Sequence, residues 1–280
     1  MSRVTSSRFG GLLREWRALR AMSQLALATE ASTTTRHLSF IETGRATPSR
    51  EMVIRLAEAL DVPLRERNAL LEAAGFASLY REHALDAAEI GPIRRVIALL
   101  LENAEPFPAV VVDRAYDVVM TNAATTRLFG LFLDPGDLAA LGRPNLIRTT
   151  FHPYGLHRFV QNWAEAGPVL LGRLQREAQR LPSTDPVHRL LEEVVAYPGI
   201  TSECKPPNLD RALPPVVALH LKRGEFEARL FGTITTVGTP QDVTLQELRI
   251  ESFLPADAET EELVRRLATK DAAAAIAASV

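Results

Sequence analysis

The order of hydrophobic and polar residues predicts that the chain has two parts of different kinds. In the first 75 residues, apolar positions recur at intervals of three and four, the period of helices that bury one face. Five short helices in so few residues indicate a compact all-α domain. Their predicted ranges are 8–21, a helix opening at 23, 34–43, 48–60 and 64–74.

The rest of the chain mixes helical periods with β-branched and alternating runs. We expect an antiparallel sheet that holds helices on one face, which makes the chain α+β overall. The expected helices are a linker over 76–90 and segments at 93–101, 122–129, 153–180, 186–197 and 259–280. The expected strands are 109–112, 118–121, 216–221, 228–236 and 242–253, with a short strand or turn at 145–150. These patterns divide the chain at 1–76, 77–104, 105–258 and 259–280.

Composition and charge restrict the classes of protein. A chain of 280 residues with 46% hydrophobic content accommodates about two domains. It contains no apolar run of about 18 residues and no secretory leader at its start, and its one cysteine, Cys204, excludes an internal disulfide. We therefore expect a cytoplasmic protein. Residues 1–50 hold eight arginines and three glutamates, a net charge of +5, so the remaining residues carry a net charge of −7. Because only the first part is basic, we expect that part to bind a polyanion.

The stretch 23–44 predicts two short helices joined by a tight turn. Ser23 is a good N-cap, and Gly44 ends the second helix without strain. Leu38 and Ile41 lie three residues apart and share an inward face, so Thr35, Arg36, Ser39 and Phe40 point outward. A short helix that presents polar groups and an arginine across a second helix has the geometry of a major-groove reader.

This stretch resembles the helix-turn-helix domains of the lambda-repressor/Cro-like (XRE) family. The resemblance rests on Ser23-Gln24, Ala28, Leu38 with Ile41, the Glu42-Thr43-Gly44-Arg45 ending and Pro48-Ser49, and covers about residues 8–75. Ser32 departs from it, because the family usually has glycine at the turn. The resemblance implies an operator in double-stranded DNA. The implied DNA contacts are Gln24, Thr34, Thr35, Arg36, His37, Ser39, Phe40 and Arg45.

Within that set, the residue types suggest different roles. Arg36 suits a bidentate contact with guanine, whereas Arg45 suits a phosphate. Phe40 stands at a position that is polar in the family, so it either touches a thymine methyl group or folds back onto the domain. Glu42 is expected to pair inside the domain, because a carboxylate beside phosphates would repel them.

The second part resembles the MmyB-like transcription regulators. The matching pieces are FPAVVVDRAYDVVMTNAATTRLFG, then NLIRTTFHP, then a helix containing Trp163, all after an apolar helix that follows the first domain. The resemblance implies a C-terminal PAS-like domain that binds a ligand. Thr121 stands where the family often has tryptophan, a departure that could reshape a pocket.

Abundant apolar residues with few polar anchors suit an amphiphile with an anionic head, such as a fatty acid. Arg148 is the preferred anchor because it lies between apolar residues in the NLIR segment, although an internal salt bridge would also explain it. His152, His157 and His220 are weaker candidates, since partly exposed or internally bonded histidines are commoner than ligand anchors. The predicted ligand contacts are Asn122, Arg148, Phe151, His152, Trp163 and His220.

The sequence offers no recognisable catalytic centre. It lacks HExxH, GxSxG and a glycine-rich phosphate loop, and no histidine lies near Cys204. His152 and His157 have no evident third metal ligand. We therefore expect no catalytic residues, no metal, no cofactor other than a bound amphiphile, and no membrane partner. The predicted function is a homodimeric DNA-binding regulator that senses an amphiphile; the alternative is a second domain that only dimerises.

Overall fold

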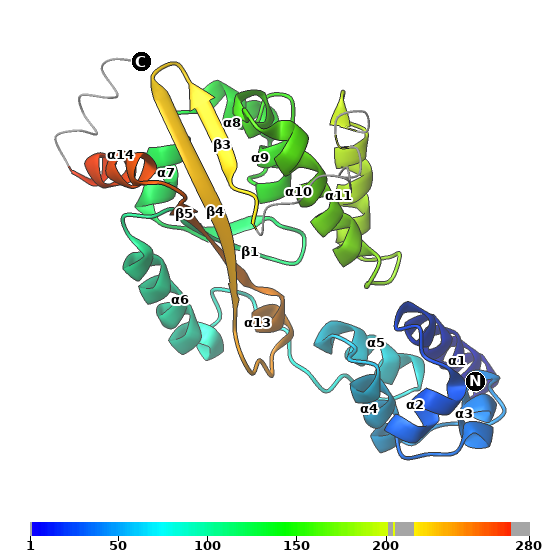
Figure 1. Ribbon diagram of the computed structural model, residues 1–280. Helices are drawn as coiled ribbons and strands as arrows, with labels where there is room; N and C mark the ends of the chain where they lie inside the picture. Colours follow the sequence, from blue (N-terminus) through cyan, green and yellow to red (C-terminus); the bar gives the residue numbers. More distant parts are fainter. Residues whose placement is uncertain (1, 201–203, 205–215, 270–280) are drawn as a thin grey trace. The chain divides into compact units, whose positions relative to one another are not determined.

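The computed structural model describes residues 2–200, 204 and 216–269, and for residues 2–7 it describes the backbone only. The chain divides into two compact units. The first contains residues 1–84 and two later segments, 178–185 and 238–246, and the second contains the remainder. Among the described residues, no helix combines the length and apolar composition needed to cross a membrane. Figure 1 shows the elements along the chain, with the helices of residues 2–73 in blue and cyan.

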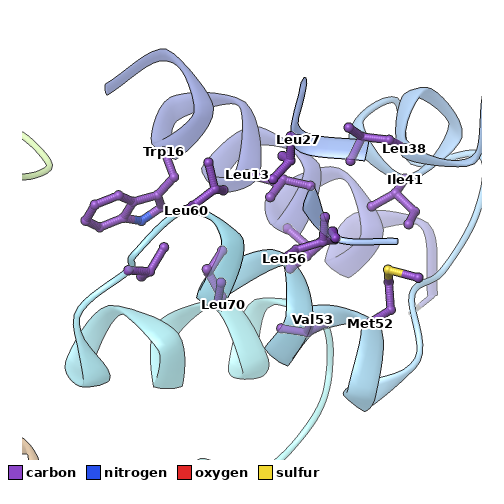
Figure 2. Packing of buried hydrophobic residues seen from close by; sticks show 14 of the residues in the cluster. Leu13, Trp16, Leu27, Leu38, Ile41, Met52, Val53, Leu56, Leu60 and Leu70 are labelled. Atoms are coloured by element: carbon purple, nitrogen blue, oxygen red, sulfur yellow. The ribbon is translucent and has the colours of Figure 1, made fainter. Parts of the chain in front are cut away.

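Five helices form the body of the first unit, as the hydrophobic period predicts. They are α1 (Ser2–Leu19), α2 (Gln24–Glu30), α3 (Thr35–Glu42), α4 (Arg50–Ala59) and α5 (Leu64–Ala73). Their apolar faces meet in one core, and Figure 2 shows side chains from all five helices in it. The largest fully buried member of that core is Trp16.

Hydroxyl side chains begin three of these helices. Ser23, Thr34 and Ser49 each have an extended backbone, and each accepts a hydrogen bond from the amide three residues later, at 3.0, 3.1 and 3.2 Å. Such caps satisfy amides that have no partner within the helix. The sequence therefore fixes where α2, α3 and α4 start.

A glycine lets α1 approach α3 closely. A Cβ atom added at Gly10 would lie 2.4 Å from the carbonyl oxygen of Glu42 and 2.9 Å from that of Ile41. No side chain fits at this distance, so the missing side chain of Gly10 sets the separation of the two helices. The adjacent Gly11 has no such neighbour within 4 Å.

The second unit is built on a five-stranded antiparallel sheet in the order β2-β1-β5-β4-β3. The α+β class with an antiparallel sheet is thereby confirmed. The strands are β1 (Ala109–Val112), β2 (Val118–Thr121), β3 (Leu219–Arg223), β4 (Phe226–Thr236) and β5 (Arg249–Pro255). Glu251 on β5 pairs with Val110 on one side and with Ile234 on the other.

Helices cover both faces of this sheet, not one face as predicted (Figure 1). On one side lie α6 (Gly91–Ala104), α7 (Ala123–Phe129) and α14 (Ala258–Ala268). On the other lie α8 (Pro135–Leu141), α9 (Leu146–Phe151), α10 (Trp163–Ala178) and α11 (Pro186–Val195). The remaining short helices are η1 (Ala88–Ile90), η2 (Leu156–Phe159) and α13 (Val243–Glu247).

Several predicted elements differ in the structure. The predicted linker helix over 76–90 is wrong except for the single turn η1. The segment 145–150, predicted as a strand or turn, contains the cap and most of the helix α9 (Leu146–Phe151), and the helix predicted from residue 153 begins only at Trp163. The predicted strand over 242–253 divides into α13 and β5, while α8 was missed. Residues 270–280 of the predicted last helix lie outside the described residues.

Candidate DNA-reading helix and ligand cavity

Helix α3 has one buried and one accessible side. Leu38 and Ile41 are fully buried in the core, as predicted. On the accessible side Arg36 is exposed, whereas Thr35, His37, Ser39 and Phe40 are partly exposed. Thr34 before the helix and Arg45 after it are both exposed. The structure therefore brings the predicted DNA contacts of α3 onto one helix whose other side is fixed in the core.

Arg36 stacks on Phe40 one turn later. The guanidinium carbon lies 5.4 Å from the centre of the Phe40 ring, within the range of a cation–π contact. No ion pair of Arg36 is found in the part of the chain that the structure describes. The ring therefore supports the guanidinium group of Arg36, whose charge no carboxylate of the first unit matches. The same contact favours the alternative in which Phe40 folds back onto its own domain.

A buried carboxylate ties α3 to α1 and α2. Glu42 is only 2% exposed, and it accepts from Arg17 Nε at 2.8 Å, Arg17 Nη2 at 3.2 Å and Gln24 Nε2 at 2.7 Å. The hydrogen bond to Glu42 raises the pKa of Arg17. The prediction that Glu42 pairs inside the domain agrees with this geometry. Gln24, predicted to contact DNA, uses one side-chain donor inside the domain.

The turn between α2 and α3 has the backbone conformation that glycine favours. Ser32 has φ of 50°, in the left-handed region. The Ser32 amide donates to Thr29 and the Thr33 amide to Ala28, which closes α2. Ser32 therefore adopts the turn geometry that glycine adopts in the family, and its backbone is strained because it carries a side chain.

The second unit contains a small cavity of about 100 Å³ between α9, α10 and strands β3, β4 and β5. Its walls are mostly apolar, and its two charged residues are Arg173 of α10 and Glu251 of β5, which form an ion pair. Glu251 is 4% exposed. Apolar residues of the wall include Ile147, Phe151, Leu170, Leu219, Leu230 and Phe253.

A second set of charges continues from this ion pair. The guanidinium groups of Arg173 and Arg249 lie 5.8 and 4.4 Å from the ring centre of Tyr116, which is fully buried. Glu177 accepts from the Tyr116 hydroxyl and, at 2.7 Å, from Arg249. Burial, together with the charge of Glu177, raises the pKa of Tyr116 to about 12. The Arg173–Glu251 pair at the cavity is therefore continuous with a network formed by Tyr116, Glu177 and Arg249.

Of the six predicted ligand contacts, Phe151 lines this cavity and the other five do not. Asn122 caps α7, and its amide group bonds four backbone groups. The ring of His152 packs against Tyr197, and His220 pairs with Glu227 at 2.7 Å. Trp163 packs edge-on against Phe151, beside the cavity but outside its lining.

Arg148 forms the internal salt bridge that the sequence left as its alternative role. Its Nε and Nη2 atoms donate to the two oxygens of Glu193 on α11 at 2.7 and 2.8 Å. Tyr197 donates to the same carboxylate. Hydrogen bonding to Arg148 lowers the pKa of Glu193. The anchor expected at Arg148 is therefore corrected: this arginine joins α9 to α11, and the arginine of the cavity is Arg173.

Replacing Arg148 with glutamine should lower the free energy of unfolding by about 0.5–1 kcal/mol at pH 7, since the pair is partly exposed. The pKa of Glu193 is lower in the folded chain than in the unfolded chain, where it is about 4.3. The pair therefore contributes its full stabilisation at pH values above about 4.3. That stabilisation is lost as the pH falls through the folded value. Urea denaturation at pH 7 and pH 3 measures the difference. The control is Arg143→Gln, which removes a far more exposed ion pair, 3.3 Å from Asp117 with the arginine 73% exposed, and should cost less at pH 7. An equal loss at both pH values in Arg148→Gln would contradict the assignment.

Sequence reasoning missed Arg173, Glu251 and Gly232, which also lines the cavity. Arg173 and Glu251 are 78 positions apart, so no local pattern joins them. The signals available were an arginine two residues after Leu171 in an apolar helix and a single glutamate in the strand after Ile250. Among the described residues, no group of three or more histidine, cysteine, aspartate or glutamate side chains is arranged to hold a metal ion.

Comparison with known families identifies both domains. The profile described as Helix-turn-helix matches residues 13–67, and the profile described as MmyB-like transcription regulator ligand binding domain matches residues 93–267. The order of domains is that of a DNA-binding regulator with a ligand-binding domain. The second match spans more than half of the chain, and the chain belongs to the MmyB-like transcription regulators, with an XRE-type helix-turn-helix domain.

Solved structures give weaker likenesses. The restriction-modification controller protein C.AhdI from Aeromonas hydrophila is 32% identical over 22% of this chain and 94% of its own, with a TM-score of 0.22. An RNA-binding light-oxygen-voltage receptor is 14% identical over 97% of this chain and 64% of its own, with a TM-score of 0.29. No curated protein matches the chain. The family assignment therefore rests on the two profiles.

Proposed function

We propose that the chain is a transcription regulator that binds a specific operator as a homodimer and changes its affinity when an amphiphile occupies the cavity. The observation that carries the DNA part is the accessible face of α3. It presents Arg36, stacked on Phe40 and free of any carboxylate in the described structure, on a helix held by Leu38, Ile41 and Glu42. A dimer would place two such helices about one turn of DNA apart.

The proposed DNA contacts divide by chemistry. Arg36 would read a guanine through its O6 and N7 atoms. Arg45, exposed just beyond α3, would neutralise a phosphate. Thr34, Thr35, His37 and Ser39 would make the shorter contacts around them, and Gln24 would use the donor and acceptor capacity that Glu42 leaves.

Replacing Arg36 with alanine is expected to weaken binding to the operator about tenfold to a hundredfold and to relax the preference at one base pair. The operator is first selected from random-sequence duplexes with the unmodified chain. Fluorescence anisotropy then compares that duplex with its single-base-pair variants.

Arg45→Ala is the matched control for this prediction. It removes an exposed arginine nearby. It should lower the affinity for all duplexes by the same factor, and it should reduce the slope of log affinity against log salt concentration by about one. An Arg36→Ala protein with unchanged affinity and unchanged base preference would contradict the assignment of α3.

The ligand part rests on the cavity beside Arg173 and Glu251. These two residues offer a ligand one cationic donor and one acceptor among apolar walls. A head group that both donates and accepts hydrogen bonds, such as a protonated carboxylic acid, matches this pair without leaving Glu251 buried and unpaired. A fatty acid that binds together with a proton is therefore the proposed ligand.

The cavity is smaller than the roughly 300–1,000 Å³ of typical ligand pockets, so a fatty acid can enter only if its walls move apart. Organic extraction of the purified chain followed by mass spectrometry tests for a copurified lipid. Thermal shift with dodecanoic acid tests binding directly, and Gly232→Leu, which alters the cavity wall, is the control expected to respond less. Absence of both a lipid and a shift would contradict the ligand proposal.

A second domain that only dimerises is the competing function. It predicts that the oligomeric state depends on the second unit and that no small molecule alters operator affinity. The proposal makes no use of an enzymatic step, since the matched families are regulatory domains that bind DNA and ligands.

A further inference from the structure

The loop that joins β4 to β5 is part of the first unit. Residues 238–246, here called the β4–β5 loop, cluster with residues 1–84, although the strands on either side belong to the second unit. The loop carries a buried carboxylate, Asp242, which is 8% exposed. Asp242 accepts from the Leu245 amide at 3.2 Å and pairs with His83 Nδ1 at 2.7 Å. This buried aspartate thus has both a local and a distant partner.

Further hydrogen bonds join the loop to the segment after α5. The Val243 amide donates to the Arg81 carbonyl at 2.9 Å, and the Thr244 hydroxyl donates to the His83 carbonyl at 2.7 Å. Arg81 and Asp242 form an isolated parallel bridge. The loop and residues 81–83 are therefore held together by backbone and side-chain groups.

The loop also supplies the missing cap of α5. Helices α2, α3 and α4 are capped by their own hydroxyl residues, but α5 follows Pro63, which has no capping side chain. The amide of Leu64 instead donates to Gln246 Oε1 at 2.6 Å. An amide of the first helical turn without a partner destabilises the helix start, so the start of α5 depends on a residue 182 positions away.

The strands attached to this loop form walls of the cavity. Leu230 and Gly232 of β4, and Glu251 and Phe253 of β5, line it. Strand β4 ends at Thr236 and β5 begins at Arg249, so both are covalently continuous with the loop. Because the cavity is too small for an amphiphile as it stands, occupancy must displace some of its walls, and β4 and β5 are two of them.

We propose that the β4–β5 loop transmits the state of the cavity to the DNA-binding unit through the Gln246 cap of α5 and the Asp242–His83 pair. This inference rests on the proposed function, since it names how that ligand site acts on the helix-turn-helix domain. The position of the loop depends on β4 and β5, with which it is covalently continuous, and on α5, to which Gln246 is hydrogen-bonded. Coupling between the cavity and DNA therefore requires these two contacts.

A double-mutant cycle on the full chain tests this route. Gly232→Leu adds an apolar side chain to a residue of the cavity wall without a ligand, and a Cβ at this position meets no atom within 4 Å. Gln246→Ala removes the cap of α5. Gln241→Ala is the matched control, since it is the same substitution at an exposed position of the same loop. Affinity for the selected operator duplex is measured for each single variant and each pair.

Gly232→Leu alone is expected to change operator affinity about fivefold or more, the lower range of allosteric coupling. In the Gln246→Ala background the change should fall below about twofold, whereas the Gln241→Ala background should keep it in full. An equal change in all backgrounds would overturn the loop as the route and leave the ligand-responsive function standing. No change from Gly232→Leu in any background would contradict both.

Hydrogen exchange of the full chain gives a readout that does not depend on DNA. Gln246→Ala should speed exchange of the Leu64 amide, and Gln241→Ala should leave it unchanged. Asp242→Asn, which keeps the side chain's size, should weaken the coupling in the same cycle. An unchanged exchange rate of the Leu64 amide in Gln246→Ala would overturn the proposal. This result does not need the affinity cycle, so it holds even where one of the variants in that cycle folds poorly.

Discussion

Replacing Arg17 with methionine is expected to lower the free energy of unfolding of the first unit by about 3 kcal/mol. Arg17 supplies two of the three hydrogen bonds that Glu42 accepts from side chains, and Glu42 is 2% exposed. Methionine keeps much of the arginine's apolar volume but leaves the carboxylate with Gln24 alone. A buried charge without its partner is costly because neither water nor a cation replaces the lost bonds.

Urea denaturation measures this effect through Trp16, in a Trp163→Phe background so that the signal comes from the first unit alone. Arg14→Met is the control, because Arg14 is exposed, lies on the same helix and bonds only the Gly10 carbonyl at 3.3 Å. It should change the free energy of unfolding by less than about 0.5 kcal/mol. Equal effects of the two substitutions would refute the stabilising role of the Arg17–Glu42 pair.

Two adjacent glycines of α1 should respond to alanine with opposite signs. At Gly10 the new methyl group would lie 2.4 Å from the Glu42 carbonyl oxygen, so α1 and α3 must separate, at a cost of about 2–3 kcal/mol. At Gly11 no neighbour lies within 4 Å, and alanine should stabilise the helix by up to about 1 kcal/mol.

The same urea titration measures both variants. Gly10→Ala should also weaken operator binding, because it displaces α3, the helix proposed to read DNA, whereas Gly11→Ala should leave operator affinity unchanged. If Gly10→Ala were as stable as Gly11→Ala, the close packing of α1 on α3 would be wrong.

The first unit was predictable because its signals are local. Apolar spacing, hydroxyl N-caps such as Thr34 and the glycine at 44 each act within a few residues, and the structure places α2, α3 and α4 between those signals. The outward direction of Arg36 and the inward role of Glu42 followed from the same spacing and from charge.

The linker was mispredicted because distant groups determine it. Residues 76–90 contain many alanines and no strong breaker, which favours a helix by propensity alone. In the structure the side chain of Asn68 bonds the Leu79 amide and both the amide and carbonyl of Tyr80. These bonds replace those of a helix, and no pattern within the segment announces them.

The helix α9 shows the opposite error. Its β-branched residues suggested a strand or turn, but Asn145 accepts from the Arg148 amide and starts a helix there.

The ligand site was the least predictable part, because Arg173 and Glu251 meet only when α10 packs on β5. Arg148 satisfied the same sequence criterion as Arg173, an arginine among apolar residues, and both are paired with a glutamate; only Arg173 lines the cavity.

The most direct test of the account is the ratio of two affinities of the unmodified chain at one salt concentration. One duplex is the operator selected from random sequences, and the other is a scrambled duplex of the same base composition. We expect the selected duplex to bind at least about a thousandfold more tightly, as specific regulators do. Arg36→Ala should reduce that ratio by acting on the selected duplex alone. Equal affinity of the unmodified chain for both duplexes would contradict the claim that α3 reads a DNA sequence.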